Sequence, residues 1–291
     1  MTKNTIKKPE PVFNSLSNSL NNSLNNAINK THSAVLITNF GDESIALIQW
    51  ALERRNQQKI QSLEIITVDT GWAAPQWASR VQLTSTWLES LGIKLTQLIP
   101  PANFTELVQT QGKFPTRKFQ WCANFLKALP ILDYLDEIDP QLNKTILLAR
   151  RRSASRVNFD LPEFIPEEPK WGDRSVWHPL YLCSQEERDA LIQKTPLPIL
   201  GHRSLECDPC VNSDQKDLLR MDLSVIQRTA DLEKKLSSQF LDPDLYQNFS
   251  TLDLVYEALL KANANFSSGF SYDFSSELFD MGCGNTFGCG L

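Results

Sequence analysis

Cysteines at three positions of this 291-residue chain are placed for chemistry at sulfur. Cys207 and Cys210 enclose a Cys-Asp-Pro-Cys turn, and Cys122 lies within a basic stretch. Two thiols three residues apart can chelate one metal ion or two corners of a cluster. We therefore expect Cys122, Cys207 and Cys210 to bind zinc or an iron–sulfur cluster, and free thiols in a loop are the alternative. Candidates for a fourth ligand are Cys183, Cys283, a histidine or an external group.

Basic side chains gather in two stretches of a chain whose formal net charge is -5. The denser stretch holds Arg150, Arg151, Arg152 and Arg156. Because the guanidinium group of arginine suits bidentate binding of phosphate, this stretch is a candidate phosphate site. A solvated surface patch is the alternative for both stretches. The second stretch surrounds Cys122 and comprises Lys113, Arg117, Lys118 and Lys127.

A loop at residues 38–41 joins a predicted strand, Ser33 to Ile37, to a predicted helix that begins at Asp42. Unpaired N–H groups and the dipole at a helix start attract anions, and a glycine lets the backbone approach a ligand. A hydroxyl or carboxylate there caps the helix, and a hydroxyl also donates to phosphate. An ordinary strand-to-helix turn is the alternative. The candidate nucleotide-binding residues of this loop are Asn39, Phe40, Gly41, Asp42 and Ser44.

Further apolar runs predict strands at residues 63–68, 93–99 and 145–148, with helical periodicity between them. Alternating strands and helices are typical of the α/β class, here a Rossmann-like parallel sheet with helices on both faces. Ligands bind beyond the carboxyl ends of such strands, so the loops that follow them should gather at one edge. That edge would include Asp69, Thr70 and Gly71, where the Asp69 carboxylate could bind a ribose hydroxyl, a metal ion or a helix start.

Composition narrows the class of protein. Hydrophobic residues make up 41% and charged residues 22% of the chain, as in soluble globular proteins. The net charge of -5 argues against nucleic-acid binding by the whole surface. There is no apolar run of the roughly 18 residues that span a membrane, nor a secretory signal, so we expect a cytoplasmic protein.

The chain divides into four predicted regions. Residues 1–30 form a low-complexity Asn/Ser-rich stretch that we expect to be a disordered tail, and residues 31–213 form the nucleotide-binding domain. Residues 214–262 are predicted to be a mostly helical C-terminal extension. Residues 263–291 are rich in Gly, Ser, Phe and Cys, and we expect an irregular tail.

Five motifs occur in the order seen in the phosphoadenosine phosphosulfate (PAPS) reductase family, within the adenine nucleotide alpha hydrolase-like (PP-loop ATP pyrophosphatase) superfamily. They span about residues 33 to 213, and together they resemble that family far more specifically than any one of them. The motifs are NFGDESIALIQWA from Asn39, VDTGW from Val68, WCANFLK from Trp121, RRRSASRVN from Arg150 and CDPC from Cys207.

The resemblance implies a bound adenine nucleotide, either PAPS, its relative APS or ATP. It also implies phosphate or sulfate contacts from Lys127 and from the segment with Arg151, Arg152, Ser155 and Arg156. The C-terminal Cys-Gly-Leu resembles the mobile end of the family reductases, whose Cys attacks the sulfate sulfur, and this assigns the nucleophile to Cys289. An iron–sulfur cluster at the Cys-x-x-Cys motif is a further implication, although Trp121-Cys122 stands where those reductases have Cys-Cys.

Three functions follow. The first is thiol-dependent reduction of PAPS or APS to sulfite, with a thioredoxin-type reductant as partner; the loop favours it because Gly41 is its only glycine. The second is an ATP-dependent adenylating enzyme that uses Mg²⁺, in sulfur transfer to a small molecule or nucleic acid. The third is a non-catalytic nucleotide- or metal-binding module.

Overall fold

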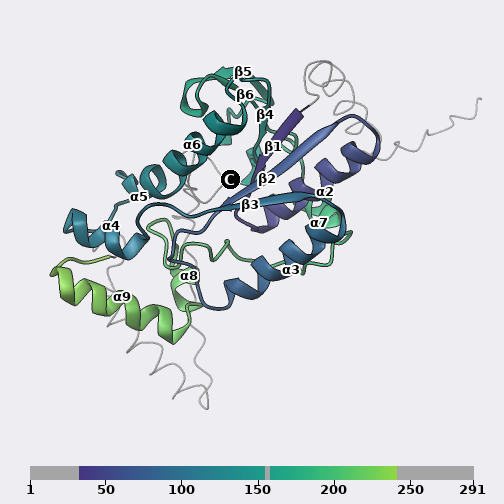
Figure 1. The fold of residues 1–291 in the computed structure, drawn as a ribbon. Coiled ribbons are helices and arrows are strands. Elements are labelled where there is room, and N and C mark those ends of the chain that lie inside the picture. Colours follow the sequence, from purple (N-terminus) through teal and green to yellow (C-terminus); the bar gives the residue numbers. More distant parts are fainter. Residues whose placement is uncertain (1–32, 155–157, 241–291) are drawn as a thin grey trace, which may run out of the picture.

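A six-stranded sheet forms the centre of the fold (Figure 1). The computed structural model describes residues 33–154 and 158–240, and the remaining residues lie outside the described part. The strands run in the order β3-β2-β1-β4-β6-β5. Their bounds are β1 Ser33–Ile37, β2 Ser62–Val68, β3 Lys94–Leu98, β4 Thr145–Leu147, β5 Phe164–Glu168 and β6 Arg174–Trp177.

The first five strands in this order pair in parallel, and only the edge strand β5 is antiparallel to its neighbour. In the register of β1 with its two neighbours, Leu36 lies opposite Ile65 of β2 and Leu147 of β4. The predicted α/β class is confirmed, and so are the four predicted strands, with ends that shift by one residue. The two strands β5 and β6 were not predicted.

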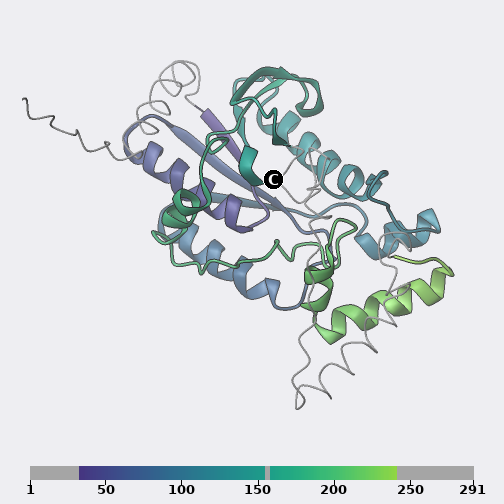
Figure 2. The same ribbon diagram turned by 180° about the vertical axis from the view of Figure 1, so that it is seen from behind.

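Helices cover both faces of the sheet, as Figures 1 and 2 show from opposite sides. One face carries α2, α3 and α7, and the other carries the run of short helices that ends in α6. The bounds on the first face are α2 Asp42–Asn56, α3 Trp77–Ser90 and α7 Gln185–Ile192. On the second they are α5 Trp121–Ala123, a π-helix Asn124–Ala128 and α6 Leu129–Ile138, whereas α4 Phe104–Gln111 packs in the third cluster described below.

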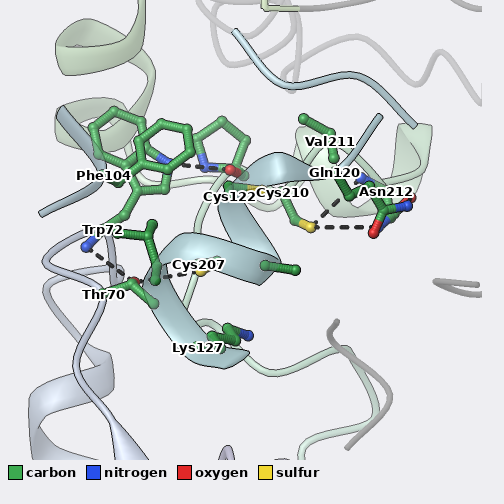
Figure 3. Close-up of a pocket in the computed structure, with 13 residues that line it drawn as sticks. Thr70, Trp72, Phe104, Gln120, Cys122, Lys127, Cys207, Cys210, Val211 and Asn212 are labelled. Carbon is green, nitrogen blue, oxygen red and sulfur yellow. Dashed lines mark hydrogen bonds between the residues drawn. The ribbon is translucent and has the colours of Figure 1, made fainter. Parts of the chain in front are cut away.

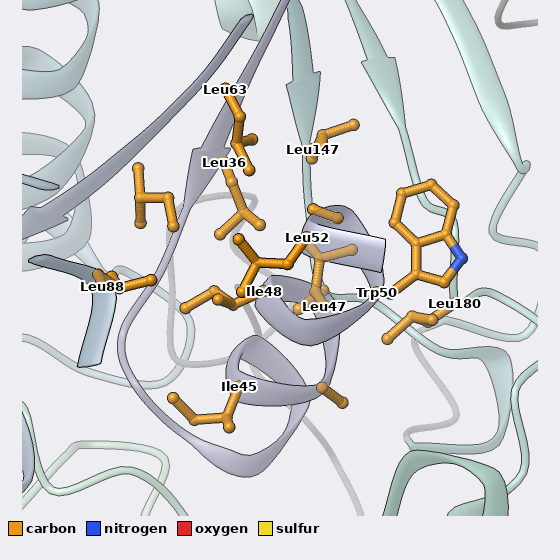
Figure 4. Close-up of a cluster of buried hydrophobic side chains, with 14 of the residues drawn as sticks. Leu36, Ile45, Leu47, Ile48, Trp50, Leu52, Leu63, Leu88, Leu147 and Leu180 are labelled. Carbon is orange, nitrogen blue, oxygen red and sulfur yellow. The ribbon is translucent and has the colours of Figure 1, made fainter. Parts of the chain in front are cut away.

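Side chains at alternate positions of the central strands belong to two separate hydrophobic cores. Ala34 and Leu36 of β1 join the cluster under α2 and α3, which Figure 4 shows, whereas Val35 and Ile37 join the cluster under α6. Side chains point to opposite faces at successive strand positions, so a strand covered by helices on both sides must be apolar throughout. This requirement explains why β1 could be recognised from sequence.

A third cluster lies at the carboxyl edge of the sheet and joins the C-terminal helices to the rest of the fold. The C-terminal helices are α8 Gln215–Leu219 and α9 Leu223–Leu236. Two 3₁₀ turns, Arg152–Ala154 and Pro169–Trp171, occur earlier in the chain. The apolar side of α9 packs with Trp72, Phe104 and Trp121. The predicted helical extension is thus helical in its described part. None of the described helices is long and apolar enough to cross a bilayer.

Candidate functional site

The order of the strands locates a ligand crevice. Chain order reverses between β1 and β4, which lie side by side although two strands and several helices separate them in sequence. Open α/β sheets bind ligands at such a switch point, beyond the carboxyl ends of the strands. The loops at this point are residues 38–41 after β1 and residues 148–151 after β4. They carry the two predicted phosphate-binding motifs.

Within the first loop, backbone N–H groups are bound by nearby side chains. The N–H of Gly41 donates to Asn39 Oδ1 at 2.9 Å, and the N–H of Phe40 donates to Thr38 Oγ1 at 2.9 Å. The Ser44 hydroxyl also donates to Asn39 Oδ1, at 2.9 Å. Asn39 therefore organises the loop in the way that a bound anion would, by accepting hydrogen bonds from it.

Gly41 is closely approached by the chain itself. A Cβ added there would lie 3.0 Å from Asn39 Oδ1 and 3.2 Å from Ser204 Cβ. Both distances are shorter than ordinary contacts, so a larger side chain at Gly41 would displace these neighbours. A valine at Gly41 would therefore disturb both the loop and its contact with the segment that carries Ser204.

The carboxylate of Asp42 anchors a distant segment. Its oxygens accept the N–H of Leu200 at 3.0 and 3.1 Å, and Asp42 Oδ1 lies 3.3 Å from Arg80 Nη2. Arg80 in turn donates to the carbonyl of Phe40 at 2.7 Å. Asp42 and Arg80 are both buried, and together they hold residues 198–201 against the loop at residues 38–41.

Glu43, in the first turn of α2, forms the principal ion pair of the crevice. Its two oxygens meet Arg151 Nε at 2.6 Å and Arg151 Nη2 at 2.8 Å, a bidentate pair. Arg188 of α7 adds a contact of 3.1 Å to the same carboxylate. Arg151 is also held by Ser153 Oγ at 3.0 Å and the carbonyl of Cys183 at 2.9 Å. The predicted phosphate ligand Arg151 is therefore buried at the crevice and bound by an internal carboxylate.

The other predicted members of this arginine segment are placed differently. Arg152 is exposed, donates to the carbonyl of Leu161 at 2.8 Å and stacks over Tyr181 at 5.3 Å. Ser155 and Arg156 lie outside the described residues, and so does Cys289. Their predicted roles remain predictions.

The loop after β2 packs tightly against the start of α4. Gly71 has φ +66°, and a Cβ there would lie 2.7 Å from Asn103 Cβ, which only glycine avoids. The Asp69 carboxylate is exposed, and it accepts the N–H of Gly71 at 2.9 Å. Thr70 is buried, and its Oγ1 donates to the carbonyl of Glu206 at 3.0 Å.

Thr70 also lines a cavity of about 30 Å³ that brings the predicted cysteines together. We call it the thiol cavity; Figure 3 shows its lining. Thr70 Oγ1 lies 3.3 Å from Cys207 Sγ, and Cys210 Sγ accepts the N–H of Asn212 at 3.5 Å. Predicted site residues in its lining are Thr70, Cys122, Lys127, Cys207 and Cys210.

The three thiols share this cavity without forming a metal site. Among residues 33–154 and 158–240, no group of three or more Cys, His, Asp or Glu side chains is arranged to hold a metal ion. The thiols of Cys207 and Cys210 instead contact Thr70 and Asn212. Binding of zinc or an iron–sulfur cluster by Cys122, Cys207 and Cys210 therefore stays a prediction.

A buried lysine closes one side of the thiol cavity. Lys127 lies in the π-helix that follows Cys122, and π-helical turns often occur at functional sites. Its ammonium group pairs with the carboxylate of Glu206, and both side chains are buried. Lys127 thus places a paired positive charge beside the thiols.

Of the candidates for a fourth ligand, Cys183 and His178 lie away from the thiol cavity, and Cys283 lies outside the described residues. Cys183 belongs to the core under α2, where burial raises the pKa of its thiol to about 12. His178 is buried with Nδ1 2.8 Å from the carbonyl of Pro162. His202 lines a second cavity, of about 150 Å³, which shares Cys207 and Cys210 with the first. There, burial raises the pKa of Asp208 to about 6.

Four residues that shape the site were not predicted from the sequence: Glu43, Arg188, Glu206 and Arg228. An acid in the first turn of a helix is a common dipole partner, so Glu43 carried no distinctive signal. Its arginine partners are 108 and 145 residues away in sequence. Only the fold brings such pairs together.

Comparisons with known proteins give similarity in structure alone. No family model and no curated protein sequence matches this chain. Similar solved structures include a phosphoadenylyl-sulfate (PAPS) reductase from Candida auris, crystallised as a phosphate complex. The match has 17% identity and a TM-score of 0.43, and it covers 67% of this chain and 91% of the reductase.

Two further structures match over most of this chain. NMN synthetase from Francisella tularensis is 13% identical with a TM-score of 0.48, and the match covers 91% of this chain and all of the synthetase. The U34-tRNA thiolase NcsA from Methanococcus maripaludis, solved with its [4Fe-4S] cluster, is 14% identical with a TM-score of 0.44. This match covers 94% of this chain and 90% of the thiolase. No ligand, residue role or reaction of this chain follows from these similarities.

Proposed function

We propose that this protein is an enzyme that binds an adenine nucleotide and uses thiols to reduce an adenylyl sulfate, PAPS or APS, to sulfite. The observation that carries the proposal is the cavity shared by Cys122, Cys207 and Cys210. It is lined by the loop after β2, at the edge where parallel sheets bind ligands. Thiols at a nucleotide crevice suit chemistry on a sulfur atom that the nucleotide carries.

Nucleotide binding in this proposal uses the loops at the switch point. Residues Asn39 to Ser44 and Asp69 to Gly71 would line the nucleotide, with phosphate or sulfate contacts from a basic set. Because Arg151 is paired with Glu43, an incoming phosphate has to compete with that carboxylate. The basic set comprises Lys127, Arg151, Arg152 and Arg156, with the hydroxyl of Ser155.

The reaction consists of two displacements at sulfur. The thiolate of Cys289 attacks the sulfate sulfur; the new S–S bond forms as the S–O bond to the nucleotide phosphate breaks, and the nucleotide leaves with that electron pair. A thiolate of a thioredoxin-type partner then attacks the Cys289 sulfur and expels sulfite. The partner's second thiol resolves the mixed disulfide, so the partner supplies both electrons and Cys289 returns as a thiol.

One observation favours a second candidate. The exposed carboxylate of Asp69 at the end of β2 could hold Mg²⁺, which ATP cleavage needs. The enzyme would then form AMP and pyrophosphate while adenylating a small molecule or a nucleic acid. A module that binds nucleotide without turnover is the third possibility.

A single panel of assays separates these functions. Protein is incubated with PAPS, APS or ATP, with and without Mg²⁺, and with a thioredoxin system. We expect sulfite from PAPS or APS. Pyrophosphate from ATP without sulfite would establish the adenylating function, and binding without either product would establish the module.

The nucleophile has its own test. Cys289→Ser should keep nucleotide affinity and lose sulfite release by more than about a hundredfold, because only the attacking atom is removed. Cys283→Ser is the matched control in the same tail. Normal turnover by Cys289→Ser would exclude Cys289 as the nucleophile.

A further inference from the structure

Two loops distant in sequence form one wall of the thiol cavity. The N–H of Asp208 donates to the carbonyl of Trp72 at 2.9 Å, and Trp72 and Cys207 pair as a parallel bridge. The indole N–H of Trp72 donates to the carbonyl of Pro209 at 3.1 Å. This register places Thr70 Oγ1 3.3 Å from Cys207 Sγ. The position of the Cys207 thiol therefore depends on how firmly these two loops are joined.

Arg228 of α9 contacts both loops at their junction. Its guanidinium carbon lies 4.2 Å from the centre of the Trp72 ring. Nη2 donates to the carbonyl of Trp72 at 2.9 Å and to the carbonyl of Asp208 at 2.5 Å, and Nη1 donates to the carbonyl of Ala73 at 3.0 Å. Hydrogen bonds from a charged donor are stronger than those between neutral groups, and a cation over an indole ring adds to them.

The helix that carries Arg228 is itself fixed. Val225, Ile226 and Ala230 of α9 are buried in the third core cluster, which also includes Trp72. Apolar packing thus fixes the helix that carries the guanidinium group, and this group contacts both loops. Arg228 does not line the thiol cavity, so it can act only through the residues that do.

We propose that Arg228 is a positioning residue of the thiol cavity: it joins the Thr70–Trp72 loop to the Cys207–Cys210 loop and so sets the access and position of these thiols. The consequence for catalysis rests on the proposed function, whereas the consequence for thiol access does not. By this proposal the C-terminal helix α9 is part of the functional site and not an appendage.

The test compares three variants of the full chain. Arg228→Met keeps a long side chain over Trp72 but removes the charge and all its hydrogen bonds. Arg228→Lys keeps the charge, and Lys235→Met removes an exposed charge from the same helix. Iodoacetamide labelling of Cys207 and Cys210 is followed by mass spectrometry, with the buried Cys183 as an internal measure of global unfolding.

We expect Arg228→Met to label Cys207 and Cys210 about tenfold faster than wild type, through local opening of the loop pair, with Cys183 unchanged. Arg228→Lys should be intermediate, and Lys235→Met should equal wild type.

Equal labelling of Cys207 and Cys210 in wild type and a folded Arg228→Met would overturn the proposal. If Arg228→Met does not fold, the comparison rests on Arg228→Lys, and wild-type labelling in that variant would likewise overturn it. An absence of sulfite with altered labelling would refute the proposed reaction and leave the positioning role of Arg228 intact.

Discussion

At the scale of single residues, His178 shows how burial links the fold to pH. The imidazole is buried, and this burial, with Arg150 nearby, lowers its pKa to about 4. In the unfolded chain its pKa is 6.5. Between pH 6.5 and about 4, the unfolded state therefore binds a proton at His178 that the folded state does not bind. The contribution of His178 to stability is therefore unaffected above pH 6.5 and declines as the pH falls toward 4.

From this we predict that wild type loses about 2 kcal/mol of unfolding free energy between pH 7.5 and 5.0 relative to a His178→Gln variant. The measurement is urea unfolding of both proteins at the two pH values. Glutamine retains a donor for the carbonyl of Pro162, so the comparison isolates the proton. Parallel pH dependence in the two proteins would mean that His178 titrates normally.

At the scale of elements, Glu43 ties together the start of α2, the loop after β4 and helix α7. Its pairs with Arg151 and Arg188 keep two guanidinium groups occupied at the crevice. Glu43→Gln would release their charge for an incoming anion and weaken the contact among the three elements. The first effect strengthens anion binding and the second lowers stability, so the two can be measured separately.

We predict that Glu43→Gln binds inorganic pyrophosphate about tenfold more tightly than wild type, which corresponds to about 1.4 kcal/mol. Its thermal unfolding temperature should fall, because the arginines lose a partly buried partner. Calorimetric titration and thermal unfolding provide the two readouts. The control is Glu53→Gln, on the same helix as Glu43, which loses a partly exposed pair with the distant Lys194. Unchanged pyrophosphate affinity would argue against Arg151 as a phosphate ligand.

The strands of the sheet differ in how well the sequence predicts them. The central strands are covered on both faces, so their apolar runs predicted them. The edge strand β5 and its neighbour β6 contain Glu167, Glu168 and Arg174, and their short mixed sequences resemble loops. The loops at the carboxyl edge were predicted to gather, because parallel strands end on the same side.

The contacts within those loops could not be predicted. Thr70 and Cys207 are 137 residues apart, and no local pattern marks such a pair. The predicted metal ligands illustrate the same limit: spacing identified Cys207 and Cys210 as neighbours, but the orientation of the thiols depends on Thr70 and Asn212.

At the scale of the whole molecule, the described fold begins with β1 at Ser33, and all six described strands follow the Asn/Ser-rich stretch in sequence. We predict that deletion of residues 1–30 leaves the thermal unfolding temperature within about 1 °C of wild type, because that composition is poor in groups that form a core. Differential scanning calorimetry of both proteins measures the difference. A fall of several degrees would assign the stretch to the folded domain.

The packing of α9 against Trp72 also has a consequence for the order in which the protein forms. During synthesis, the sheet through β6 can pair before residues 205–240 have left the ribosome, because its strands all precede them. The thiol cavity needs the later segment, and its contacts span most of the folded chain. Contacts so distant in sequence close late. The thiols of Cys207 and Cys210 are therefore enclosed only after the carboxyl edge of the sheet exists, so a nascent chain would form the loops at the switch point before it forms the thiol cavity.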